Sequence, residues 1–203
     1  MSKKTIFYVL FFTGLVISFY LVIINITDIG KESLPPLNTV RPFSFVRQDG
    51  KEITEKDIAG KTYIAEYFFT TCKGVCPKMN RNMQMIYNDL KSEKDFAILS
   101  HTVDPETDSV PVLKRYSDSI GASINNWWFL TGTKENLYKT ARESYLLDDP
   151  QNSSKNISEQ FLHTQFFALV DKTGQVRGIY DGLKKDEVEQ LVKDCRMLLT
   201  QKP

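Results

Sequence analysis

The residues best suited to chemistry are two cysteines, Cys72 and Cys76, in the segment TTCKGVCP that covers residues 70–77. Pro77 follows the second cysteine, and proline is typical of the first turn of a helix. A helix N-terminus favours thiolate over thiol because its exposed N–H groups and its dipole stabilise negative charge. The pattern therefore predicts a reactive cysteine pair at the junction between a strand and a helix.

Three kinds of site fit this pair: a structural disulfide, a redox-active dithiol and a site for a soft metal ion. A zinc site is disfavoured because it needs three or four protein ligands, and the pair has one plausible histidine to add. A peroxiredoxin is excluded, because Ala65 and Phe69 stand where that class of enzyme carries its proline and threonine. Cuprous copper can be held by two soft thiolates, but the spacing alone does not choose among the three sites.

The elements that must position the pair follow from hydrophobic periodicity. Apolar, β-prone residues predict strands over 62–70, 96–103 and 127–130, and a hairpin over 43–54 whose turn is Asp49-Gly50. Helical spacing predicts helices over 77–91 and 108–120, a third after Thr133, and a last one over 188–199. Two further strands, 166–170 and 176–180, flank a turn at Lys172-Thr173-Gly174. This order predicts an α/β fold: a thioredoxin-like mixed sheet flanked by helices, with an N-terminal β-hairpin.

The N-terminus carries an uncharged apolar segment from Thr5 to Thr27. A helix over residues 6–26 would be about 31 Å long, which matches the roughly 30 Å hydrocarbon core of a bilayer. A cleaved signal peptide is the alternative, but this apolar stretch is too long for one and no small-residue cleavage site follows it. Lys3 and Lys4 precede the segment, so the positive-inside tendency predicts a single transmembrane helix with the rest of the chain outside a bacterial cytoplasmic membrane, on the periplasmic or extracytoplasmic side.

We therefore divide the chain into a membrane anchor over residues 1–29, a proline-containing linker over 30–41, and one soluble domain over 42–203. The whole chain has an ordinary globular composition, with 41% hydrophobic and 25% charged residues. The net charge of +1 provides no field that would hold the chain on nucleic acid, so we expect no nucleic-acid partner.

Four segments of the soluble part together resemble the Sco/SenC family of copper-binding, thioredoxin-like assembly proteins. They are TTCKGVCP, HTVDPETDSVPVLKRYSDSIGA, WWFLTG and FLHTQFFALVDKTGQVRGIYDG, and the resemblance extends from about Pro42 to Leu199. It implies that Cys72, Cys76 and His163 are ligands for copper. It also implies an assembly protein that delivers copper to, or reduces the cysteines of, the copper centre of cytochrome c oxidase, with subunit II or a similar copper-accepting protein as its client. We expect a copper chaperone more than an enzyme. Lys73 and Gly74 depart from the Cys-Pro and acidic residues that many family members carry in this loop.

The alternative function is an extracytoplasmic thiol-disulfide oxidoreductase in which Cys72 and Cys76 form the redox pair. Both functions need the same cysteines, and one protein can have both.

Other residues have simpler interpretations. A lone histidine is more often structural, but His163 stands just ahead of the predicted strand 166–170, whose start lies beside the cysteine loop in a thioredoxin-like sheet. His101 ends an apolar strand and is expected to be part of the scaffold. Cys195 lies on the apolar face of the last helix and is expected in the core. Asp108 is interpreted as a helix N-cap or as part of an acidic surface with Asp104.

Overall fold

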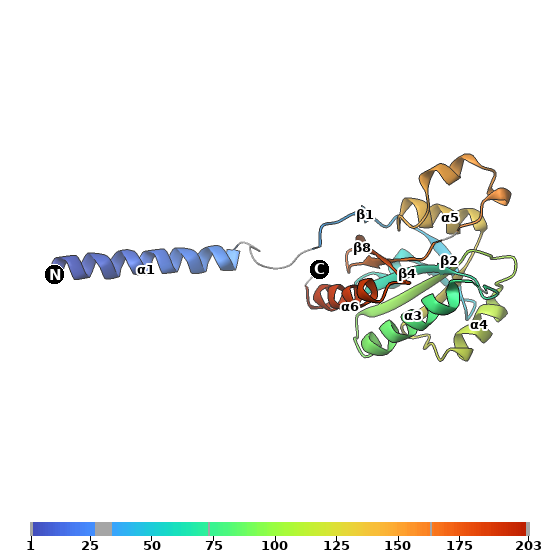
Figure 1. The fold of residues 1–203 in the computed structure, drawn as a ribbon, viewed down its shortest axis with the longest axis horizontal. Helices are drawn as coiled ribbons and strands as arrows, with labels where there is room; N and C mark the ends of the chain where they lie inside the picture. Colours follow the sequence, from blue (N-terminus) through green and yellow to red (C-terminus); the bar gives the residue numbers. More distant parts are fainter. Residues whose placement is uncertain (1, 27–33, 73, 163, 202–203) are drawn as a thin grey trace. The chain divides into compact units, whose positions relative to one another are not determined.

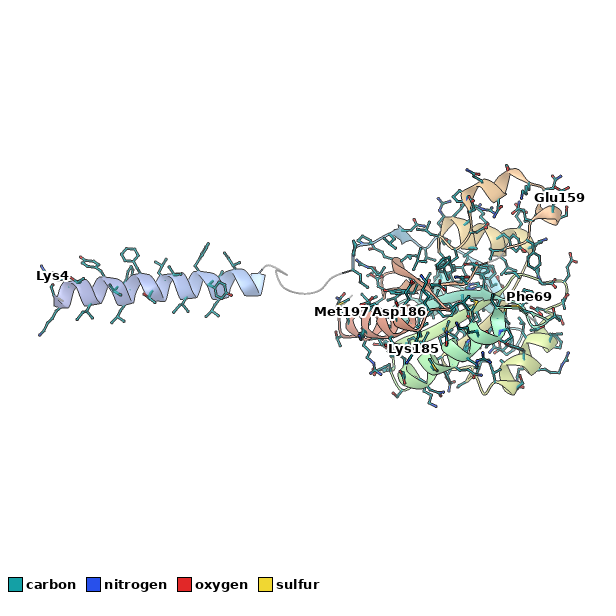
Figure 2. All side chains as sticks on the ribbon, viewed as in Figure 1. Lys4, Phe69, Glu159, Lys185, Asp186 and Met197 are labelled. Carbon is teal, nitrogen blue, oxygen red and sulfur yellow. A yellow bond between two sulfur atoms is a disulfide. The ribbon has the colours of Figure 1, made fainter. Side chains whose placement is uncertain are left out.

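The computed structural model describes residues 2–26, 34–72, 74–162 and 164–201. The chain forms two compact units, residues 1–34 and 35–203, which are described separately. The first consists of helix α1 (Lys3–Ile26), drawn in blue in Figure 1. A stretch of α1 over residues 3–23 is long and apolar enough to cross a membrane, by length and composition. Its large apolar side chains, among them Leu10, Phe12 and Val16, are exposed. Figure 2 shows the side chains of this helix as sticks, with Lys4 labelled near its start.

The second unit is built on a mixed sheet that has eight strands in the described part of the chain, in the order β1-β8-β7-β4-β5-β6-β2-β3. The strands are β1 (Asn38–Thr39), β2 (Ser44–Arg47), β3 (Glu52–Thr54), β4 (Thr62–Phe68), β5 (Phe96–Thr102), β6 (Trp127–Thr131), β7 (Phe166–Val170) and β8 (Gln175–Asp181). β4, β5 and β6 are parallel, and the other neighbours are antiparallel. Every residue of β4 and β5 is buried, as expected for central strands covered on both faces.

Helices cover both faces of this sheet (Figure 1). They are α2 (Glu55–Ile58), α3 (Cys76–Leu90), α4 (Val110–Ser119), α5 (Lys134–Glu143) and α6 (Lys185–Thr200). The apolar face of α5, with Leu137, Tyr138 and Ala141, packs into one core with Tyr63 and Leu99 of the sheet. α3 and α6 pack against each other, with α4 beside β6, on the other face. The predicted thioredoxin-like mixed sheet flanked by helices is confirmed.

Hydrogen-bond chemistry at the helix ends accounts for two local details. Thr133 caps α5 as predicted, since its side chain accepts a hydrogen bond from the N–H of Asn136 at 3.3 Å. The N-cap of α4 is Ser109, so the interpretation of Asp108 as the N-cap is wrong. Asp108 lies one residue further out, and its carboxylate is used elsewhere in the fold.

Candidate metal centre

The cysteine pair lies in the loop that leads from β4 into α3. Cys76 is the first residue of α3 and is buried, whereas Cys72 is half-buried in the loop before it. The two sulfur atoms form a disulfide, and the Cα atoms are 5.9 Å apart. The backbone carbonyl of Val75 accepts hydrogen bonds from the N–H groups of Lys78 and Met79, which continue the chain into the helix. The pair therefore lies at a helix N-terminus, where thiolate is favoured once the disulfide is reduced.

A cavity of about 700 Å³ opens beside the pair. Cys72 and Cys76 line it, and the other lining side chains are mainly apolar: Tyr67, Phe68, Phe69, Val75, Val103, Leu162 and Phe166, with Thr164 and Gln165. Phe69, labelled in Figure 2, also meets Phe161 edge to face, with ring centroids 5.6 Å apart. An apolar wall beside two sulfur atoms suits a soft ligand and limits the access of water.

His163, the third residue implied by the family resemblance, lies outside the described residues. Its neighbours Leu162 and Thr164 both line the cavity that Cys72 and Cys76 line. The N–H of Leu162 donates to the hydroxyl of Tyr138 at 3.3 Å, and that hydroxyl donates to the carbonyl of Val103 at 2.9 Å. Leu162, the residue before His163, is thus linked through Tyr138 to Val103 in the loop that follows β5.

Gln165, two residues after His163, is hydrogen-bonded to the end of β8 and to the loop that follows it. The side-chain amide of Gln165 donates to the carboxylate of Asp181 at 2.7 Å. The carbonyl of Gln165 accepts a hydrogen bond from the N–H of Gly182 at 2.8 Å. A side chain at position 182 would collide with the carbonyl of Gln165 and with the ring of Phe167, because an added Cβ would lie 2.8 Å and 2.5 Å from them. Glycine is therefore required there for the two loops to approach.

The remaining cysteine and histidine are part of the scaffold. Cys195 is fully buried in α6, and burial raises the pKa of its thiol to about 12, so it stays protonated at neutral pH. His101 is fully buried in β5 and stacks on Tyr67 with ring centroids 4.9 Å apart. Burial lowers the pKa of His101 to about 4, so its ring is neutral. Among the residues that the structure describes, which do not include His163, no group of three His, Cys, Asp or Glu side chains could hold a metal ion.

Two buried carboxyl groups have roles that sequence reasoning missed. Glu66 is buried in β4, where its Oε1 accepts a hydrogen bond from the hydroxyl of Ser100 at 2.6 Å. Burial raises the pKa of Glu66 to about 7, and Ser100 partly opposes this effect. Asp108 is fully buried and therefore is not part of an exposed acidic surface. The available signal for Glu66 was one acidic residue inside the apolar run YIAEYFF.

Comparison with known proteins places this site in a family. A family model described as SCO1/SenC matches residues 31–200 of the chain. The chain belongs to the SCO1/SenC family. Its similarity to a SCO1 protein homologue of Bacillus subtilis is 32% identity over 178 residues, which covers 85% of this chain and 90% of the relative. Against the mitochondrial SCO1 of Saccharomyces cerevisiae the identity is 33%, and the match spans 45% of that longer protein.

Solved structures of SCO1/SenC proteins share the fold. One is BsSco, described as a member of the Sco family of cytochrome c oxidase assembly proteins with a disulfide switch, at 32% identity and a TM-score of 0.69. It covers 83% of this chain and is itself covered to 98%. Yeast Sco1 with copper bound aligns at 26% identity with a TM-score of 0.60, covering 83% of this chain and 97% of the yeast one.

Proposed function

We propose that this SCO1/SenC protein is a membrane-anchored copper chaperone that carries cuprous copper on Cys72 and Cys76, with His163 as a third ligand. It delivers the ion to the copper centre of cytochrome c oxidase, whose subunit II, or a similar copper-accepting protein, is the client. Relatives described as copper-bound Sco proteins and as oxidase assembly proteins support this proposal. The thiol-disulfide oxidoreductase alternative is not favoured by the same comparisons.

The observation that carries the proposal is the position of the two sulfur atoms at the start of α3, on the wall of one largely apolar cavity. Cuprous copper is a soft d¹⁰ ion that two thiolates can hold, so the donor set fits it. The two residues that flank His163 line the same cavity, which supports an imidazole as an additional donor. Cupric copper prefers more ligands and a nitrogen donor, so His163 matters more in that oxidation state.

Loading requires the disulfide to be reduced first. An external dithiol reduces the Cys72–Cys76 disulfide to two thiols by thiol–disulfide exchange and is itself oxidised to a disulfide, and each cysteine thiol then loses its proton when it binds the ion. A client with thiolate or imidazole ligands then receives the ion by ligand exchange, with no change in its oxidation state. Cys72 is half-buried, whereas Cys76 is buried, so we propose that the client's first ligand replaces Cys72.

The proposed location is the extracytoplasmic face of a bacterial cytoplasmic membrane, with residues 1–29 as the anchor. The linker predicted over 30–41 is shorter in this proposal, because β1 (Asn38–Thr39) pairs with β8 and so is part of the sheet. Helix α1, with its exposed apolar side chains, supports a single membrane span. A SCO1/SenC family lipoprotein from Bacillus anthracis, at 32% identity and a TM-score of 0.70, supports attachment to a membrane in another form.

Two measurements on the full chain in detergent test this function. Cuprous affinity is measured by competition with a colorimetric chelator, and reductase turnover is measured on a disulfide-bonded model substrate with a thiol reductant. We expect tight binding of one copper ion per reduced chain and negligible turnover. Sustained turnover together with weak copper binding would support the oxidoreductase alternative and overturn the proposal.

A further inference from the structure

Thr70, in the loop that leads to the cysteine pair, is hydrogen-bonded to the buried carboxylate of Asp108, which lies in the connection between β5 and α4. The N–H of Thr70, two residues before Cys72, donates to Oδ2 of Asp108 at 3.1 Å, and the hydroxyl of Thr70 donates to Oδ1. The carboxylate of Asp108 also accepts a hydrogen bond from the hydroxyl of Thr102, which donates to Oδ2 at 2.6 Å. Asp108 therefore connects Thr70, two residues after the end of β4, to Thr102, the last residue of β5.

These bonds extend the pairing of β4 and β5 beyond the sheet. Phe68 and Thr102 are the last pair in register, and the N–H of Val103 donates to the carbonyl of Phe68 at 2.9 Å. Beyond the end of β4, the hydrogen bonds between Thr70 and Asp108, here called the Asp108 clamp, add a further connection. Asp108 is itself fixed, because its own N–H donates to the carbonyl of Asp104 at 2.8 Å.

The complete burial of Asp108 is unusual for an acidic residue. Its side chain is fully buried, and a buried carboxylate costs free energy unless hydrogen bonds and dipoles compensate. Two hydroxyls, one backbone N–H and the nearby N-terminus of α4 supply that compensation. Replacing buried ionic groups by well-packed apolar residues is often neutral for stability, so we look for a role of Asp108 in the direction of its hydrogen bonds.

The two cysteines differ in how they are held. Cys76 is part of α3, whereas Cys72 is held within the described residues by the disulfide and by a hydrogen bond from its N–H to the carbonyl of Phe69 at 3.3 Å. When the disulfide is reduced, one of these two restraints is lost. The hydrogen bonds between Thr70 and Asp108 lie two residues before Cys72 and do not depend on the disulfide.

We propose that Asp108 is a positioning residue that, through Thr70, keeps the two thiols of the reduced loop close enough to bind one soft ion or to close again into a disulfide. The copper part of this inference rests on the proposed function. The disulfide part does not, because the equilibrium between the dithiol and the disulfide reports the effective concentration of one thiol at the other.

The test compares two matched variants of the full chain in detergent, Thr70→Val and Thr102→Val. Each removes one hydroxyl that donates to the same carboxylate, but only Thr70 is on the cysteine loop. Thr102 is fully buried and Thr70 is half-buried, so a purely structural effect would be larger for Thr102→Val. Asp108→Ala, which removes the acceptor of these bonds and of the bond from the Thr70 N–H, is the third variant.

The first readout is equilibration with glutathione, in which the protein disulfide and two glutathione thiols exchange to give the protein dithiol and glutathione disulfide. The second is cuprous affinity by chelator competition. We expect Thr70→Val to shift both about 10-fold, toward the dithiol and toward weaker copper binding, since loss of a residue that orients metal ligands typically costs about 10- to 100-fold. Asp108→Ala should shift both at least as far, and Thr102→Val should shift both less than Thr70→Val does.

Equal shifts for Thr70→Val and Thr102→Val, or no shift in the glutathione equilibrium for Thr70→Val, would overturn the positioning role. A wild-type chain that binds no copper would instead overturn the proposed function, and the glutathione equilibrium would still decide the role of Asp108. If Asp108→Ala does not fold, the two threonine variants decide it.

Discussion

Glu66 and His101 make opposite contributions to the pH dependence of stability. They lie on adjacent strands, β4 and β5, and both are completely buried in their neutral forms. Glu66 has a folded-state pKa of about 7, against 4.5 for an ordinary Glu, because burial disfavours its carboxylate. His101 has a folded-state pKa of about 4, against 6.5, because burial disfavours its imidazolium. At about 1.4 kcal/mol for each tenfold change in proton affinity, each difference corresponds to about 3 kcal/mol.

The two contributions have opposite signs. Glu66 stabilises the fold fully below pH 4.5, and this contribution is lost as the pH rises towards about 7, because the unfolded chain releases its proton first. His101 stabilises the fold fully above pH 6.5, and this contribution is lost as the pH falls towards about 4, because the unfolded chain takes up a proton first. Between pH 4.5 and 6.5 the two trends cancel in the wild-type protein.

Single variants uncover each trend. As the pH rises from 4.5 to 7, the free energy of unfolding of Glu66→Gln should increase by about 3 kcal/mol relative to wild type. As the pH rises from 4 to 6.5, that of His101→Phe should decrease by about 3 kcal/mol relative to wild type. The assay is urea unfolding of the oxidised full chain in detergent, followed by the fluorescence of the buried Trp127 and Trp128 at half-unit steps of pH. Differences between each variant and wild type remove the background from surface carboxyl groups. Parallel profiles for wild type and Glu66→Gln would refute the reasoning that the buried carboxyl is neutral.

Three further predictions concern the anchor and the site. Deletion of residues 1–30 should leave a soluble, folded, copper-binding domain, because α1 would serve the bilayer and not the core; aggregation without a thermal transition would contradict this. Cys195→Ser should keep the copper stoichiometry, measured by metal analysis, and lower the free energy of unfolding by about 1 to 3 kcal/mol, because a hydroxyl replaces a buried thiol. His163→Ala should keep most cuprous affinity but lose the long-lived thiolate-to-copper charge-transfer band after cupric addition; an unchanged band would remove His163 from the site.

Periodicity predicted the central elements well. The strands and helices around the cysteine pair, such as β4 and α3, have the burial that their sequences indicate, with Met79, Met83 and Leu90 on the inner face of α3. β1 gave no such signal, because its residues Asn38 and Thr39 follow two prolines and pair with β8 from far along the chain. Such pairing depends on tertiary contacts that local spacing does not encode.

The site was only partly predictable for a similar reason. The short segment around Cys72 and Cys76 contains its own chemical signal, so the pair could be found from the sequence. The Asp108 clamp could not, because it joins residues 38 positions apart and depends on the register of β4 against β5. The sequence supported a helix cap at Asp108, since an acidic residue before a helix is usually a cap. The actual cap, Ser109, leaves the Asp108 carboxylate free to bind Thr70 and Thr102.

Cuprous titration of Cys72→Ser and Cys76→Ser, with Cys195→Ser as the matched control, tests the central claim most directly. A serine hydroxyl is a harder donor and is not ionised at neutral pH, so each site variant retains one soft ligand. We predict that both site variants lose tight binding of the ion in chelator competition, whereas Cys195→Ser binds one ion per chain with wild-type affinity. Wild-type affinity in either site variant would contradict the assignment of copper to this cysteine pair.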